Sequence, residues 1–246
     1  MVSTLDNYQS DATKFFKMKM DLNLKVPDLN LTQDGTVTYG VLKMQDYIVN
    51  GLDHEKKPYY LNGVESQKDS FVFATKGHPE AFPYYKGSNY EVFKVRISFT
   101  HLLIVLPNVG ASLSDVNVSE AYTNFISENK YRAAYGYIPF FHNKVEGQNL
   151  VKTLDGVVSL NEVYMSKLLE DDVVNDLMID SIIQSNDFEF NKYGVSGESI
   201  TAIPTVGKSA PADEKPLDLS VNRPFYAFSL KDDFPLFINK VTNPGK

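Results

Sequence analysis

The sequence predicts an α+β fold built mostly from antiparallel β-sheet, with a few helices. Three observations lead to this prediction. Short runs rich in β-branched and aromatic residues lie between residues 71 and 107, separated by turns that contain glycine or proline. Two apolar runs flank a charged turn, residues 231–233, near the end of the chain. Helical spacing of apolar residues marks two segments, residues 10–25 and 112–129.

The composition limits the classes of protein and partner. The chain has 246 residues, 43% of them hydrophobic, and a formal net charge of −7. A sizeable core is therefore expected, whereas the acidic balance argues against a nucleic acid partner, because phosphates need a basic surface. The absence of cysteine excludes disulfides and thiolate metal sites. No apolar run is long enough to span a bilayer, and the first ten residues do not read as a signal peptide.

The first half of the chain alternates strand and turn signals. The helix predicted over residues 10–25 ends before Pro27. Residues 36–49 are β-rich and apolar enough for an inner strand, and Asn50-Gly51 and Asn62-Gly63 are turn signals. Short strands follow, with the sequences FVFAT, PYYK, YEVFKVRISF and HLLIVLP.

The second half begins with a strand predicted over residues 130–141, which contains Pro139. Short helical turns are expected within residues 150–169, and a long strand over residues 177–191. Residues 194–215 are rich in Ser, Gly, Ala, Pro and Thr and predict a loop. A loop of this length within a compact domain is usually functional or disordered. No linker divides the chain, so a single domain is predicted over residues 1–246.

Residue types that perform catalysis or bind metals are present without the necessary spacing. The four histidines, His54, His78, His101 and His142, do not pair at metal-ligand spacing. The acidic pairs at residues 171–172 and 232–233 fit solvated turns better than a general acid/base pair. No nucleophile or phosphate-binding motif occurs. The sequence therefore predicts no enzyme, no catalytic residues, no metal and no cofactor.

The end of the chain resembles the end of the serpins, where Arg-Pro-Phe opens a hairpin that closes with Leu-Phe-x-Gly-x-Val-x-Asn-Pro. The matching residues are Arg223-Pro224-Phe225 and LFINKVTNP at residues 236–244, with Asn239 where the family prefers glycine. Weaker matches occur in the family's order at Leu61-Asn62-Gly63, Pro83-Tyr84-Tyr85, LLIVLP at residues 102–107 and FEFN at residues 188–191. The resemblance covers nearly the whole chain and implies a partial serpin-like domain, in which the N-terminal helices, about a third of the family's fold, are missing.

In the serpins, the loop after the strand that matches FEFN at residues 188–191 is bait for a protease. Cleavage lets this loop insert as a new strand into a large sheet. The resemblance makes residues 194–216 such a reactive-loop-like segment. Its hinge would be Gly194, Val195, Ser196 and Gly197, and family spacing places the reactive bond at Lys208-Ser209. A lysine before that bond implies a trypsin-like serine protease as partner.

Several family positions differ here, and they bear on activity. Tyr39 and Gln184 stand where the family has a hydrogen-bonded Asn and His, and Lys192 replaces a glutamate at the base of the loop. We therefore expect a non-inhibitory serpin-like structural, storage or interaction protein. The alternative is a serine protease inhibitor cleaved at Lys208-Ser209, completed by a separate N-terminal chain. A binding protein for a small hydrophobic ligand is a third reading.

The resemblance also implies partners and a location. Residues 36–49 would form an exposed edge strand, suited to a homo- or hetero-oligomer. The family implies a secreted, extracellular protein, and the sequons at Asn30 and Asn117 would then be glycosylation candidates. The apolar side chains of the last hairpin, Phe225, Phe228, Phe237 and Ile238, are expected to lack part of their cover.

Overall fold

A computed structural model describes three long stretches of the chain in detail. The described residues are 54–150, 183–196 and 215–245, together with Ser10, Lys14, Lys17, Met18, Leu42, residues 44–47 and Leu154. The chain divides into two compact units, residues 1–40 with 144–187 and residues 41–143 with 188–246. Most of the first predicted helix and of residues 36–49 and 150–169 lies outside the described residues. The single domain over residues 1–246 stays a prediction.

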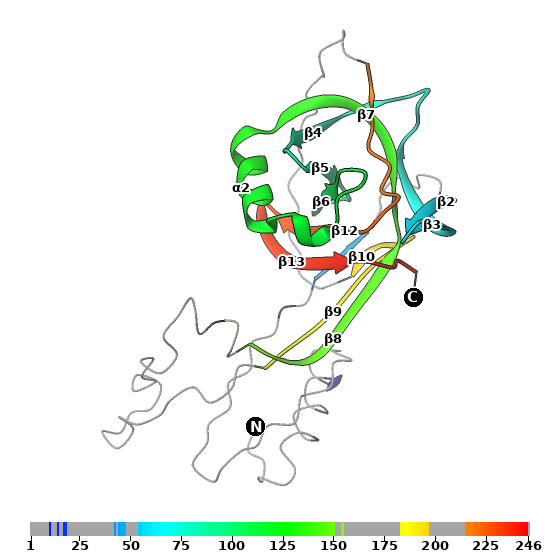
Figure 1. Ribbon diagram of the computed structural model, residues 1–246. Helices are drawn as coiled ribbons and strands as arrows, with labels where there is room; N and C mark the ends of the chain where they lie inside the picture. Colours follow the sequence, from blue (N-terminus) through cyan, green and yellow to red (C-terminus); the bar gives the residue numbers. More distant parts are fainter. Residues whose placement is uncertain are drawn as a thin grey trace. The chain divides into compact units, whose positions relative to one another are not determined.

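The larger sheet has nine strands in the order β13-β12-β6-β5-β4-β7-β3-β2, with β11 paired to β7. Its strands are β2 (His54–Leu61), β3 (Val64–Ala74), β4 (Glu80–Lys86), β5 (Tyr90–Arg96), β6 (His101–Pro107), β7 (Lys130–Pro139), β11 (Leu217–Asp218), β12 (Phe225–Lys231) and β13 (Phe234–Val241). Figure 1 shows β7 curving around β4, β5 and β6. All neighbours are antiparallel except β11 and β7, which confirms the predicted fold class.

Two hairpins of this sheet close through residues with left-handed backbone. Asn62 and Gly63, with φ of 52° and 77°, join β2 to β3. Asp232 and Asp233, with φ of 50° and 63°, join β12 to β13. Such two-residue turns match the twist of paired strands and favour Asn, Asp and Gly. The predicted turn at Asn62-Gly63 and the predicted last hairpin are both confirmed.

The smaller sheet has four strands in the order β1-β10-β9-β8. They are β1 (Gln45–Tyr47), β10 (Gly194–Ser196), β9 (Ile183–Asn191) and β8 (Phe141–Asn149). The strand predicted over residues 130–141 is confirmed as β7 up to Pro139, but it ends there, and Phe141 already starts β8. Proline has no N–H for a sheet, and the amide of Phe140 instead donates to the carbonyl of Asp69 at 2.9 Å.

The helix predicted over residues 112–129 is also divided. A 3₁₀ turn, η1 (Leu113–Asp115), precedes the α-helix α2 (Val118–Glu128). The Asn117 side chain accepts a hydrogen bond from the Glu120 amide at 3.2 Å and so starts α2 after an extended residue. No helix of the described residues is long and apolar enough to cross a membrane.

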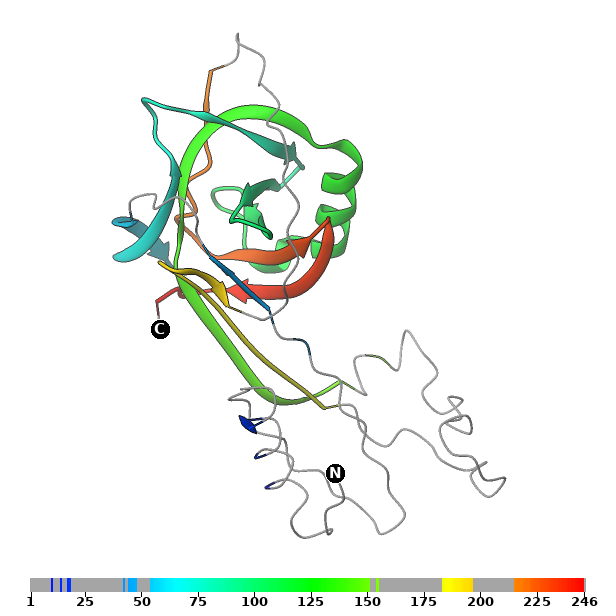
Figure 2. The ribbon, with the colours of Figure 1, turned by 180° about the vertical axis from the view of Figure 1, so that it is seen from behind.

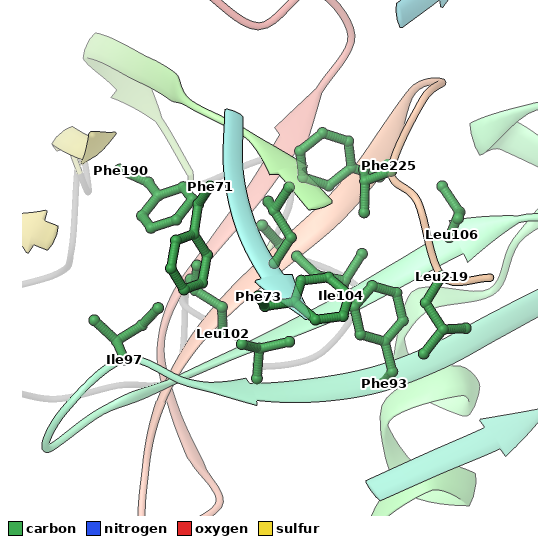
Figure 3. Packing of buried hydrophobic residues seen from close by; sticks show 14 of the residues in the cluster. Phe71, Phe73, Phe93, Ile97, Leu102, Ile104, Leu106, Phe190, Leu219 and Phe225 are labelled. Atoms are coloured by element: carbon green, nitrogen blue, oxygen red, sulfur yellow. The ribbon is translucent and has the colours of Figure 1, made fainter. Parts of the chain in front are cut away.

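The core explains what covers the last hairpin (Figure 3). Phe225 is completely buried and meets the Phe141 ring edge-on at 5.7 Å. Phe228 is 1% exposed and stacks on Tyr122 of α2, also at 5.7 Å. The expectation that these side chains lack cover is therefore wrong for Phe225 and Phe228, because β8 covers the first and α2 the second. Of the four, only Ile238 is largely exposed, at 59%.

Candidate functional site

The predicted reactive-loop-like segment is described at its two ends, β10 and β11. Residues 197–214 lie outside the described residues, and with them Gly197, Lys208 and Ser209. Asn30 and Tyr39 also lie outside. Asn117 is exposed at the start of α2, and Gln184 is exposed on β9. The candidate site is therefore the pair of anchors from which the segment leaves the two sheets.

The first anchor is a tight hairpin between β9 and β10. Asn191 pairs with Gly194, so only Lys192 and Tyr193 form the turn. The Asn191 side chain accepts a hydrogen bond from the Tyr193 amide at 2.8 Å, and the Lys192 ammonium lies 4.9 Å from the centre of the Tyr193 ring. Gly194 has φ of 136°, a conformation that favours glycine. This turn directs the chain straight back along β9.

β10 lies between β1 and β9 and is antiparallel to both. Val195 stands opposite Asp46 on one side and Phe190 on the other. Its side chain is 1% exposed and joins the main core. Figure 2 shows β10, in yellow, beside β1, in blue. The prediction that a loop starts at Gly194 is wrong for three residues, because the tight turn and the apolar Val195 place them in the sheet.

β1 is fixed by a buried carboxylate that the sequence analysis did not single out. Asp46 is 2% exposed. Its Oδ2 accepts hydrogen bonds from the amides of Ser98, Phe99 and Thr100 at 3.2, 2.9 and 2.8 Å, and from the Thr100 hydroxyl at 2.7 Å. These donors belong to the turn between β5 and β6. The one visible signal was an acidic residue in a predicted inner strand.

The second anchor is a parallel pairing of residues 217–221 with β7. Leu217 pairs with Ala134 and Asp218 with Tyr135. The amides of Leu219 and Val221 donate to β7 carbonyls, each at 2.9 Å. The two backbones come close at Gly136, where an added Cβ would lie 2.7 Å from the carbonyl carbon of Leu219. Glycine in a strand often marks such a close approach.

The ionisable groups around the second anchor are suited to structure rather than to proton transfer. Tyr137 donates its hydroxyl to the Pro58 carbonyl at 2.8 Å, and burial raises the pKa of Tyr137 to about 12. Tyr59 donates to the Thr242 carbonyl at 2.9 Å, and burial raises its pKa further. Both phenols therefore remain neutral donors near neutral pH. No group of three metal-binding side chains occurs among the described residues.

The arrangement of the two sheets and of α2 recurs in solved serpin structures. No family model and no curated protein matches the sequence. The matching solved structures include a serpin from Schistosoma mansoni, with 17% identity, a TM-score of 0.61 and coverage of 97% of this chain and 64% of that chain. They also include tengpin, a thermophilic serpin in its native state, with 15% identity, a TM-score of 0.64 and coverage of 96% of this chain and 62% of that chain.

A further match is human thyroxine-binding globulin complexed with thyroxine, at 15% identity and a TM-score of 0.63, covering 99% of this chain and 66% of that chain. The chain thus spans 62–66% of the length of these three structures. The structural similarity confirms the predicted serpin-like fold, and at identities this low it shows the fold alone. The fold is shared by proteins whose names indicate different activities, so activity has to be argued from the site.

Proposed function

We propose that this chain is a non-inhibitory protein with the serpin fold, of the structural, storage or interaction kind. This role requires no catalytic residue. The observation that supports it is β10, because the beginning of the reactive-loop-like segment already lies in the sheet. Serpin inhibition, as the resemblance implies it, depends on insertion that follows cleavage. Here Gly194–Ser196 is paired on both sides and Val195 is buried before any cleavage. The free energy released by inserting these residues therefore cannot contribute to deforming a bound protease.

Digestion with trypsin tests the proposal. We expect cleavage within residues 194–216 and no SDS-stable complex, because the protease is released before further insertion can deform it. Lys208→Ala should remove the cut at the predicted bond. Lys215→Ala, a change at an exposed lysine near β11, is the matched control and should leave that cut in place. Gel electrophoresis and mass spectrometry of the fragments measure both outcomes.

The alternative, a protease inhibitor, is favoured by the same sheet. β1 and β9 already accept a strand between them, and further insertion would continue β10 without rearranging the pairs. In the same digestion, an SDS-stable complex that Lys208→Ala abolishes and Lys215→Ala preserves would establish this alternative and exclude the non-inhibitory proposal. Cleavage without such a complex would support the non-inhibitory proposal.

For the interaction role we propose strand addition at β1. Among the described residues β1 is the terminal strand of the four-stranded sheet, the position at which a partner strand adds in β-augmentation. We expect light scattering of the purified chain to give a mass above the 27.7 kDa of one chain. A stable monomer at all concentrations would argue against a homo-oligomer.

We also infer an extracellular location. The support is the family resemblance and the sequon at Asn117, whose side chain is exposed and uses its oxygen, not its amide nitrogen, to cap α2. The nitrogen is the atom that a glycan would modify.

A further inference from the structure

A pocket of about 410 Å³ opens beside the second anchor. This volume lies within the range of small-molecule sites. Four charged residues line it: Lys86 at the end of β4, Glu91 on β5, Asp218 on β11, and Arg223 just before β12. The remaining lining groups are mostly amides and a hydroxyl. The opening therefore has two positive and two negative side chains around it, together with apolar surface that includes Val109.

These opposite charges do not form ion pairs with one another. In the part of the chain that the structure describes, no ion pair within 4.0 Å joins Lys86 or Arg223 to Glu91 or Asp218, although the Glu91 charge acts on Arg223. Four charges of both signs that line one space without pairing offer both positive and negative contacts to a ligand. A ligand with only one charge would satisfy half of them.

Three of the four side chains are held in place by neighbouring groups. Arg223 donates from Nε to the Pro107 carbonyl at 2.6 Å and from Nη1 to the Asn222 side chain at 2.9 Å. A guanidinium has five N–H donors, so others remain for a ligand. Burial lowers the pKa of Arg223, and the Glu91 charge opposes this effect.

The carboxylates are fixed in the same way. Glu91 Oε1 accepts a hydrogen bond from the Tyr84 hydroxyl at 3.1 Å, and Asp218 Oδ1 accepts one from the Ser220 amide at 3.1 Å. In each of these two hydrogen bonds only one carboxylate oxygen takes part, so acceptor capacity remains. Groups fixed before binding lose less conformational entropy when a ligand arrives.

We propose that this pocket binds a small zwitterion of the amino acid or short peptide class. Its carboxylate would face Arg223 and Lys86, and its ammonium group would face Glu91 and Asp218. A molecule that carries both charges satisfies both halves of the pocket, and each contact is a charge-assisted hydrogen bond, stronger than a neutral one. Since Asp218 belongs to β11, the ligand would bind directly on the second anchor.

Three matched probes test the proposal by calorimetry and NMR titration of the whole chain. Triglycine carries both charges, N-acetyltriglycine only the carboxylate, and triglycine amide only the ammonium group. We expect triglycine to bind, and each blocked probe to bind at least about tenfold more weakly, which is about 1.4 kcal/mol. No binding of triglycine at millimolar concentration, or equal binding of all three probes, would overturn the proposal.

Two variants check that the named carboxylates carry the selectivity. The double variant Glu91→Gln with Asp218→Asn removes both negative charges at nearly constant shape. It should bind N-acetyltriglycine at least as well as triglycine, whereas Asp69→Asn, at an exposed residue of β3 away from the pocket lining, should keep the preference for triglycine. Circular dichroism confirms that each variant is folded. An unchanged preference in the folded double variant would contradict the assignment.

Discussion

Replacement of Gly136 by alanine is expected to lower the free energy of unfolding by about 3 kcal/mol. The new methyl group would lie 2.7 Å from the carbonyl carbon of Leu219 and 2.8 Å from the nitrogen of Ser220. Both are backbone atoms, which cannot rotate away as the end of a side chain can. Gly136 also has φ of 157°, at the edge of the region that favours glycine. Urea denaturation measures the loss.

We expect Gly136→Ala to loosen the second anchor under conditions in which the rest of the fold is still intact. Because residues 217–221 must move off β7, we expect faster hydrogen exchange at the amides of Leu219 and Val221, which donate to β7. Gly77→Ala is the matched control, since no atom lies within 4 Å of its added Cβ; its stability should change by less than about 1 kcal/mol. Equal losses for the two variants would show that the close approach at Gly136 has no energetic weight.

Replacement of Asp46 by alanine should also cost about 3 kcal/mol, because it leaves four donors of the β5–β6 turn without their buried charged acceptor. Asp46→Asn retains an acceptor oxygen in the same position but no charge, so we expect a smaller loss, about half as large. The exposed Asp69 of β3 provides the control Asp69→Ala, with an expected change within about 0.5 kcal/mol.

The Asp46 variants also test how β1 supports β10. If the carboxylate holds β1 in place, hydrogen exchange at Gly194–Ser196 should accelerate in Asp46→Ala and remain unchanged in Asp69→Ala. A loss of global stability without any change at these amides would mean that Asp46 stabilises the β5–β6 turn alone. The proposed docking of the segment between β1 and β9 would then need another explanation.

The sequence predicted those parts of the fold in which each strand carries its own pattern. β6 is a continuous apolar run, and the last hairpin has apolar strands around a charged turn, so both were found. β2 was missed because its sequence, HEKKPYYL, is mostly polar, and Tyr59 is its one buried side chain. β10 was missed because its strand character comes from pairing with β1 and β9, which are distant in the sequence.

The candidate site could be predicted in part for the same reason. No sequence pattern relates β1 to the β5–β6 turn, so the role of Asp46 needed the structure. Gly136 was visible as an isolated glycine in a predicted strand, a signal of close backbone approach that could have located the second anchor. The charged pocket joins residues from three strands and from the segment before β12, and no local pattern marks it.

The placement of β12 has a consequence for any hydrolysis within residues 197–214. β12 pairs with β6 on one side and with β13 on the other, and Phe225, Phe228 and Leu230 are buried. The polypeptide after the break therefore includes an interior strand of the nine-stranded sheet. After cleavage the two fragments would stay together as one folded complex of unchanged mass. The smaller fragment could be separated only by unfolding the larger one.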